Sequence, residues 1–415
     1  MGHSHAHAHR DGPGDVPLAR GPVRVLLVFL ALAAVATVIG VVALWPDTGK
    51  VDALRDKAQF TAPGVTFVDA TVESVSTTCP DQGTGTGEGA DPGGGPGDAP
   101  SCGTVTATLD EGPEKGASQT VGVPTAVAES GLAGGDRVRL VRVPGDAGAP
   151  ASYSFDDVLR LKPLWVLWIA FIVVVGLVAR LRGILALVSL GFAGFVLLKF
   201  MLPALLSGSS GMAVSLVGSA AIMFVVLYLA HGPSARTSAA LAGTLLGVGV
   251  TAAVGEIAIG GANLSGFGDE GAALLSAFAS TLSFQGIFTC ALVVAGLGVL
   301  NDVTITQASA VWELREAGPE LSRRQLFTSA MRIGRDHIAS TIYTIVFAYA
   351  GSALAVLMLL SLYDRPVFDL LSTETLAEEV VRTLASGIGL VLAVPITTAI
   401  AVATVAGPAA QGGRA

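Results

Sequence analysis

The sequence predicts a mainly α-helical membrane protein, a polytopic bundle of about eight transmembrane helices, with a small all-β, OB-like extracytoplasmic domain after the first helix. Two compositional observations support this fold class. Of the 415 residues, 52% are hydrophobic and only 13% are charged, whereas a soluble chain carries about 25% charged residues. The mean hydropathy is +0.67. A third observation is that long apolar runs follow one another through the second half of the chain.

The low charge also disfavours several classes of protein. A soluble monomer or a disordered chain of this length needs more charge to remain hydrated. The formal net charge of −8 and the isoelectric point near 5.2 argue against a surface that binds nucleic-acid phosphates. We therefore expect the lipid bilayer, and no nucleic acid, as a partner.

Residues 1–22 form a polar tail that we expect to be disordered and cytoplasmic. Its alternating histidines could collect Zn²⁺, Ni²⁺ or Cu²⁺, or bind metal weakly without functional consequence. No further Cys/His group follows at a metal-ligand spacing, so we expect no structural metal site and no cofactor. The four histidines are His3, His5, His7 and His9.

The first transmembrane helix is expected within residues 23–46, where Val25 to Trp45 is an unbroken apolar run. This run is longer than the apolar region of a signal peptide, and no clean small-residue cleavage site follows it. We therefore expect the helix to be retained.

Residues 47–162 are acidic and rich in β-forming residues, which predicts a small extracytoplasmic barrel or sandwich of five strands. Four strands are predicted, at 65–75, 104–109, 119–123 and 137–143. In the first strand, alternation places Asp69 and Glu73 on one face. The opposite face then carries Thr66, Val68, Ala70, Val72 and Ser74.

Between the first two strands, residues 82–101 are mostly Gly, Asp, Pro and Thr, and we expect a mobile loop there. Cys79 and Cys102 flank this loop and could form a disulfide in an oxidising compartment; their pairing stays open. OB-like domains bind oligomers through stacked aromatic residues. The aromatic residues here are few: Phe60, Phe67, Tyr153 and Phe155. A purely structural barrel is therefore favoured over one that binds oligomers.

Residues 163–406 predict a seven-helix transmembrane domain, followed by a cytoplasmic tail at 407–415. An amphipathic stretch, Glu270–Ser283, is expected at the membrane surface. The predicted helices are 164–180, 183–204, 211–230, 237–257, 284–301, 338–361 and 382–406.

Charge placement supports an even number of spans with both termini in the cytoplasm. With that orientation, the short outer loops at 207–210 and 258–269 contain no Lys or Arg, and the outer loop at 362–381 has one Arg among five acidic residues. The basic residues fall on the inner side: Arg180, Arg182, Arg236, Arg315, Arg323, Arg324, Arg332, Arg335 and Arg414.

Small residues recur on several helices, among them Ala239, Gly243 and Gly247, at four-residue spacing. We interpret them as helix-packing positions, because small side chains let helices approach closely in lipid. Pro395 lies midway along the last predicted helix and predicts a bend, which could also line a substrate site.

Polar residues at membrane depth give the best candidate site, because each is costly if it faces lipid. They could form a polar cluster at the cytoplasmic mouth of a cavity and relay protons or hold a cation. Alternatively, Asp302 caps a helix at 303–317 and Asp336 caps the helix at 338–361, while Arg335 meets lipid phosphate. The candidate cluster consists of Asp302, Asp336, Arg335, His231 and Asn301.

No catalytic motif of a soluble enzyme is present: the sequence lacks a P-loop, a GxSxG or HExxH motif and a Rossmann fingerprint. We therefore expect no enzymatic activity and no catalytic residue.

From about residue 65 to residue 406, the chain resembles the YibE/F-like family of bacterial membrane proteins. Its most specific segments are Ala295–Val303, Ala308–Leu314 and Arg332–Asp336, with a further match at Phe347–Gly351. The β domain leading into 164–178 and the basic break at 180–183 also match. The resemblance implies a multi-pass membrane protein with an inner-side pair of aspartates, and it implies no particular chemistry.

Two functions remain open at this stage. A permease-like bundle would move a small solute or ion, with Asp302 and Asp336 as coupling or gating groups and Arg335 setting their ionisation. Alternatively, the helices would anchor the β domain and present it to an envelope partner, or support a homo-oligomer. In both cases the expected location is the bacterial cell membrane.

Overall fold

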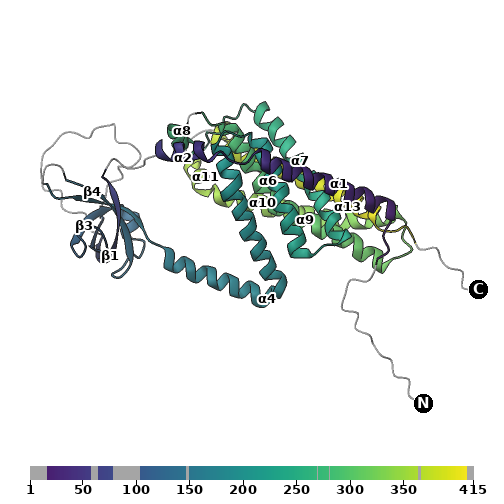
Figure 1. Ribbon diagram of the computed structural model, residues 1–415, viewed down its shortest axis with the longest axis horizontal. Coiled ribbons are helices and arrows are strands. Elements are labelled where there is room, and N and C mark those ends of the chain that lie inside the picture. The colour runs from purple at the N-terminus through teal and green to yellow at the C-terminus, as the bar shows by residue number, and fades with distance from the viewer. Residues whose placement is uncertain are drawn as a thin grey trace, which may run out of the picture. The chain divides into compact units, whose positions relative to one another are not determined.

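The computed structural model describes residues 16–57, 64–77, 103–145, 149–268, 270–279, 281–362 and 366–408 (Figure 1). The histidine tail, Cys79, Cys102, Phe60 and the Gly-rich stretch 82–101 lie outside the described residues. The chain divides into two compact units: Ala58–Val175, which contains the β strands, and Met1–Lys57 with Gly176–Ala415, which is helical.

The β unit is a curled, five-stranded antiparallel sheet with the strand order β3-β2-β1-β4-β5. The edge strands β3 and β5 also contact each other. The fifth strand, β5, follows the four that alternation predicts. The elements are β1 (Thr66–Ser76), β2 (Gly103–Leu109), β3 (Ser118–Val123), the short helix α3 (Thr125–Ala128), β4 (Arg137–Val143) and β5 (Ser152–Val158).

Alternation along β1 places its side chains as predicted up to a β-bulge. Val68, Ala70 and Val72 are at most 2% exposed, and Ala70 and Val72 form the core of the sheet with residues of β2 to β4. The pairing register between β1 and β2 shifts between Val72 and Ser74. Since a one-residue shift exchanges the two faces of a strand, Ser74 is exposed, contrary to prediction.

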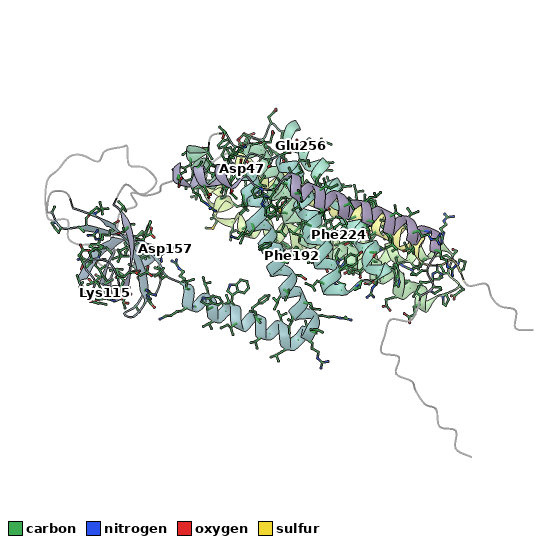
Figure 2. The ribbon with its side chains drawn as sticks, viewed as in Figure 1. Asp47, Lys115, Asp157, Phe192, Phe224 and Glu256 are labelled. Carbon is green, nitrogen blue, oxygen red and sulfur yellow. The ribbon has the colours of Figure 1, made fainter. Side chains whose placement is uncertain are left out.

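A charged network joins β4 and β5 to the turn between β2 and β3. Arg142 donates to both carboxylate oxygens of Glu114, from Nε at 2.8 Å and from Nη2 at 2.7 Å. The hydroxyl of Tyr153 donates to the same carboxylate at 2.8 Å. The hydrogen bonds from Arg142 and then from Tyr153 lower the pKa of Glu114 from 4.5 to about 2, because they favour the charged carboxylate. Figure 2 labels Lys115 and Asp157 in this unit.

We expect Glu114→Gln to weaken the sheet near neutral pH and to matter less in acid. The wild-type carboxylate contributes stability above its unfolded pKa, near 4.5, and that contribution is lost as the pH falls towards its folded pKa of about 2. Hydrogen exchange of β4 and β5 amides, corrected for the pH dependence of intrinsic exchange, measures the difference. Glu129→Gln is the control at another glutamate of this unit. A difference between Glu114→Gln and wild type that stays constant with pH would contradict the expectation.

The helical unit contains long helices, several of which begin at a serine cap. The side chains of Ser210, Ser234, Ser283 and Ser322 accept backbone N–H groups at the starts of four of them. The helices are α1 (Arg20–Ala43), α2 (Thr48–Lys57), α4 (Leu161–Val196), the π-helix η2 (Leu197–Met201), α5 (Leu202–Leu206), α6 (Gly211–His231), α7 (Ala235–Gly261), α8 (Glu270–Phe278), α9 (Phe284–Ala317), α10 (Arg323–Ser352), α11 (Leu354–Ser361), α12 (Val367–Leu371) and α13 (Glu374–Thr404). The first part of α4 belongs to the β unit.

Among the described residues, six helices are long and apolar enough to cross a membrane, or seven when the bent pair of α10 and α11 counts as one span. The run Leu161–Leu206 counts as one helix in this total. The sequence predicts two helices in the same run, at 164–180 and 183–204. Arg180, inside α4, has a non-helical backbone with φ 53° and ψ −138°. The chain therefore breaks where the two predicted helices meet.

The predicted ends of α9 and α10 are wrong. Helix α9 continues sixteen residues past Asn301, to Ala317, and α10 begins at Arg323 rather than at residue 338. Neither Gly nor Pro interrupts the chain between Val303 and Ala317, and much of 307–317 consists of good helix formers. A window of apolar residues finds only the apolar part of a helix, which is shorter than the helix itself.

Both termini of the helical unit lie at one end of the bundle, which we call the tail end. There Leu18 bridges Val405, and the Ala19 N–H donates to the Thr404 carbonyl at 2.9 Å. At the opposite end, which we call the α8 end, the Ser265 N–H donates to Glu374 at 2.7 Å. Figure 1 shows α2, α8 and α11 at this end. Asp47 and Glu256, labelled in Figure 2, also lie there.

Helices α7, α9 and α13 form the centre of the bundle, and each of the three packs against the other two. Their buried positions include many Gly, Ala, Ser and Thr residues, which allows the close approach of helices.

Candidate functional site

The predicted aspartates lie inside helices. Asp302 is in α9 and Asp336 is in α10, both far from a helix start, so neither caps a helix. The capping alternative predicted from the sequence is therefore wrong. Asp302 lies two residues before Thr304, whose hydroxyl is 2.6 Å from that of Thr244 in the bundle interior. The aspartate thus lies along the packed length of α9 rather than at its end.

The structure pairs Asp302 with His337, which the sequence analysis did not include in the cluster. The Asp302 Oδ2 atom and the His337 Nε2 atom are 3.5 Å apart, close enough for an ion pair but without hydrogen-bond geometry. The neighbouring Asn301 Oδ1 is buried without a hydrogen-bond partner among the described residues. The pair joins α9 to α10.

The other predicted members of the cluster lie apart from this pair. Arg335 and Asp336 are exposed on α10. His231 is exposed at the end of α6, where its charged neighbours are Arg236 and Arg182. The described hydrogen bonds and ion pairs do not connect His231 to either aspartate.

A column of buried polar side chains runs through the centre of the bundle. Besides the contact between Thr244 and Thr304, the Gln307 amide donates to the Thr398 hydroxyl at 2.7 Å and to the Ala330 carbonyl at 3.0 Å. These bonds join α7 to α9 and α9 to α10 and α13. Gln307 is 3% exposed and Thr398 is fully buried.

Two hydroxyls of this column have no hydrogen-bond partner among the described residues: Thr251 Oγ1 of α7 and Thr397 Oγ1 of α13. Both residues are fully buried. Most helical Ser and Thr side chains donate to a carbonyl one turn back, as Thr398 and Thr404 do. The sequence analysis missed this column because it interpreted the small residues only as packing positions.

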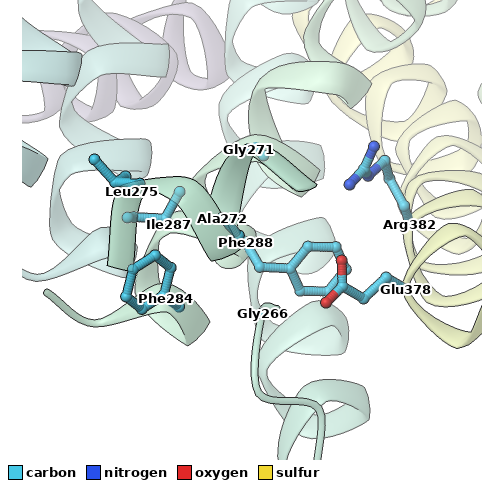
Figure 3. Close-up of a pocket in the computed structure, with 10 residues that line it drawn as sticks. Gly266, Gly271, Ala272, Leu275, Phe284, Ile287, Phe288, Glu378 and Arg382 are labelled. Carbon is cyan, nitrogen blue, oxygen red and sulfur yellow. The ribbon is translucent and has the colours of Figure 1, made fainter. Parts of the chain in front are cut away.

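At the α8 end, α8, α9 and α13 enclose a pocket of about 230 Å³. Figure 3 shows side chains of α8 and α9 on one side of it and Glu378 and Arg382 of α13 on the other. The Arg382 guanidinium lies 5.4 Å from the centre of the Phe288 ring and pairs with Glu379 at 3.0 Å. Most of the remaining lining is apolar.

Two glutamates one turn apart on α13 hold the loop that follows α7. Glu374 accepts the Ser265 N–H at 2.7 Å, and Glu378, 5% exposed, accepts the Gly268 N–H at 2.9 Å. A Cβ atom at Gly268 would lie 2.6 Å from the Glu378 carboxyl carbon, so a larger residue there would displace this carboxylate. The carboxylates therefore fix the wall of the pocket.

The described residues contain no group of three or more His, Cys, Asp or Glu side chains that could hold a metal ion. The arrangement instead offers the pair of Asp302 and His337, whose side chains are 65% and 30% exposed, and an interior that contains hydroxyls and one amide. Such groups can exchange a proton or coordinate a small polar solute.

The family model of YibE/F-like proteins matches residues 167–407. The chain belongs to the YibE/F-like family. The match starts in α4 and covers every helix after it, so the central helices, the ion pair and the pocket all lie within the YibE/F-like region. No curated protein and no solved structure matches the sequence.

We expect Glu378→Ala to loosen the loop at 262–268 of this YibE/F-like chain. A hydrogen bond to a charged group contributes about 1.5–3 kcal/mol, and its loss frees the loop at the start of α8. Hydrogen exchange of the detergent-purified protein should rise in peptides covering 262–278 and stay unchanged at the tail end. Glu320→Ala, at an exposed residue between α9 and α10, is the control. Unchanged protection of 262–268 would contradict the expectation.

Proposed function

We propose that the chain is an integral, multi-pass protein of the bacterial cell membrane that moves a small solute or ion in the manner of a permease. Its membrane location is supported by broad apolar surfaces. On α4, Leu177 is 75% exposed and Val178 is 81% exposed, and on α10 Phe347 is 71% exposed. Water would disfavour such surfaces, whereas lipid accommodates them.

We propose eight crossings. The helical run Leu161–Leu206 has 46 residues, about 70 Å at 1.5 Å per residue, or roughly twice the 30 Å hydrocarbon core. Its break at Arg180 lets it cross twice. The bent pair of α10 and α11 crosses once, and α1, α6, α7, α9 and α13 supply the other five crossings.

The direction of the helices supports this even number. The Trp45 ring, after α1, lies 6.1 Å from that of Phe200, near the end of the α4 run, so both helices end at the α8 end. The chain must therefore return to the tail end between them, and residues 161–179 form the apolar helix that can do so. Both ends of the helical unit then lie on one side of the membrane.

We assign the tail end to the cytoplasm, because arginines gather there at the start of α7 and where α9 ends and α10 begins. They are Arg236, Arg315, Arg323 and Arg324. The β unit is then extracytoplasmic. Its five-stranded order with contact between β3 and β5 fits an OB-like barrel.

The buried polar column carries the proposal of transport. A bundle that only anchors another domain could pack equally closely with apolar side chains of the same size, without the cost of unpartnered hydroxyls in the membrane. Thr251 and Thr397 retain this cost at the centre of the bundle. The pair of Asp302 and His337 supplies groups whose protonation can be coupled to movement.

The proposed topology predicts which introduced cysteines an impermeant maleimide reaches in intact cells. In a chain without its own cysteines, Glu129→Cys in the β unit should be labelled, whereas Glu320→Cys between α9 and α10 should be labelled only after the cells are opened. Both residues are exposed, so accessibility reports the side of the membrane. Labelling of both residues in intact cells would contradict the topology.

We expect Asp302→Asn to abolish proton-coupled movement while the protein still folds and inserts. The probe is a pH gradient imposed across liposomes that contain the full chain and a trapped pH-sensitive dye. Wild-type protein should dissipate the gradient faster than empty liposomes, and Asp302→Asn should reduce the excess rate by tenfold or more, about 1.4 kcal/mol, because the carboxylate can no longer titrate. Asp336→Asn, at the exposed neighbour of His337, is the matched control.

An anchor function gives a different result in the same assay. Wild-type liposomes would then dissipate the gradient no faster than empty ones, and Asp302→Asn would be silent in cells, whereas deletion of residues 51–160 would abolish function. That pattern would replace the transport proposal with the presentation of the β unit to an envelope partner.

A further inference from the structure

Helices α7 and α13 cross through two reciprocal contacts. A Cβ atom built on Gly243 of α7 would lie 2.0 Å from Thr397 Oγ1 of α13. Conversely, a Cβ atom built on Gly389 of α13 would lie 1.9 Å from Thr251 Oγ1 of α7. Each helix thus presents a glycine and, eight residues later, a threonine, and each threonine lies on the glycine of the other helix.

The midpoint of the two contacts is also a contact. Gly247 lies halfway between Gly243 and Thr251, and a Cβ atom on it would lie 3.0 Å from the Cβ atom of Ala393. Ala393 in turn lies halfway between Gly389 and Thr397. Because α7 and α13 are antiparallel, this pattern is that of a two-fold axis perpendicular to both helices at Gly247 and Ala393.

The amino-acid sequence repeats in the same register. Each of eight residues of α7 has an identical residue in α13, 146 positions later, the same offset that relates the glycines and threonines of the crossing. The repeated residues of α7 are Arg236, Thr237, Ala239, Gly243, Leu246, Val248, Thr251 and Ala253.

The neighbouring helices follow the same symmetry in part. Helix α6 packs on α7 as α10 packs on α13. Helix α9 contacts all four of these helices and so lies across the axis on one face of the crossing, whereas α1 contacts α6, α7 and α13 on the other face. The packing is tighter on the α9 side, where Leu300 lies 3.0 Å from the Cβ position of Gly247. On the α1 side, a groove of about 440 Å³ remains between α1, α7 and α13.

We propose that the crossing of α7 and α13 is an inverted, two-fold pair about which the bundle rocks, so that opening at one end accompanies closing at the other. The contact between Gly243 and Thr397 closes the tail end, and the contact between Gly389 and Thr251 closes the α8 end. Because the two-fold axis exchanges these contacts, tilting α13 in one direction or the other costs nearly the same free energy. This symmetry deepens the proposed transport function by supplying its alternating movement.

The test adds a methyl group to one contact at a time. Gly243→Ala should open the tail end and Gly389→Ala the α8 end, since each new Cβ atom meets a threonine hydroxyl at about 2 Å. The control substitutions are Gly249→Ala in α7 and Gly387→Ala in α13, where a Cβ atom meets nothing within 4 Å.

The readout is the rate of maleimide labelling in the full chain in lipid nanodiscs, with its own cysteines replaced. One reporter is Ala239→Cys, towards the tail end, and the other is Ala385→Cys, towards the α8 end; the two residues are equivalent under the two-fold axis and are at most 1% exposed. Gly243→Ala should speed labelling at 239 on the order of tenfold and slow it at 385. Gly389→Ala should do the reverse, and both controls should change neither rate.

Second-site changes keep the test decisive if an alanine variant folds poorly. Thr397→Ala should restore the parental labelling pattern to Gly243→Ala, and Thr251→Ala should restore it to Gly389→Ala, because each removes the oxygen that the new methyl group meets. Labelling that rises at the same reporter in both alanine variants would overturn the proposal. Rescue of Gly243→Ala by Thr251→Ala, or of Gly389→Ala by Thr397→Ala, would also overturn it. This test measures labelling and not transport. A failure of the proposed transport function would appear in the liposome assay, whereas a failure of the symmetry would appear in the labelling rates.

Discussion

The structure of the bundle depends on the absence of side chains at two positions, Gly243 and Gly389. In the proposed membrane location, lipid gives apolar helices no hydrophobic reason to associate with one another, so close van der Waals packing must hold them together. Each glycine admits a threonine of the opposite helix, which brings α7 and α13 to their shortest approach. Helix α9 packs along both of them, and α10 joins through Gln307. The order of the central helices therefore follows from this one crossing.

The same crossing explains the location of the unpartnered polar groups. Thr251 and Thr397 occupy the glycine surfaces, and neither donates to the carbonyl one turn back. An unpaired buried hydroxyl costs about 1–3 kcal/mol, so close packing must offset that cost in this arrangement. Charged groups are found nearer the ends of the helices, with Glu378 and Arg382 at the α8 end and most of the arginines at the tail end. The interior thus contains neutral polar groups, for which burial costs less than for charges.

The sequence predicts local structure well and long-range contact poorly. The strand from Arg137 to Val143 is found at its predicted bounds, because β alternation and turns are local signals. The fifth strand, Ser152–Val158, is less apolar and was not among the predicted strands. The pairing of Asp302 with His337 joins two helices, so no window of sequence contains it. Likewise, the glycine and threonine spacing is visible in α7 and in α13, but its meaning requires knowing that the two helices are antiparallel neighbours.

The incomplete symmetry around the crossing has an energetic consequence. A perfectly two-fold bundle would have equal free energies when open at either end, and ligands alone would decide its state. Here the groove between α1, α7 and α13 lies towards the tail end, beside Leu26 and Ala242, while α9 covers the opposite face through Leu300. The two states of the proposed rocking motion therefore differ in free energy by contacts that α1 makes at one end. Since close packing rather than hydrophobic burial holds helices together in lipid, a modest change in the packing of α1 on α7 and α13 is enough to change which state is preferred.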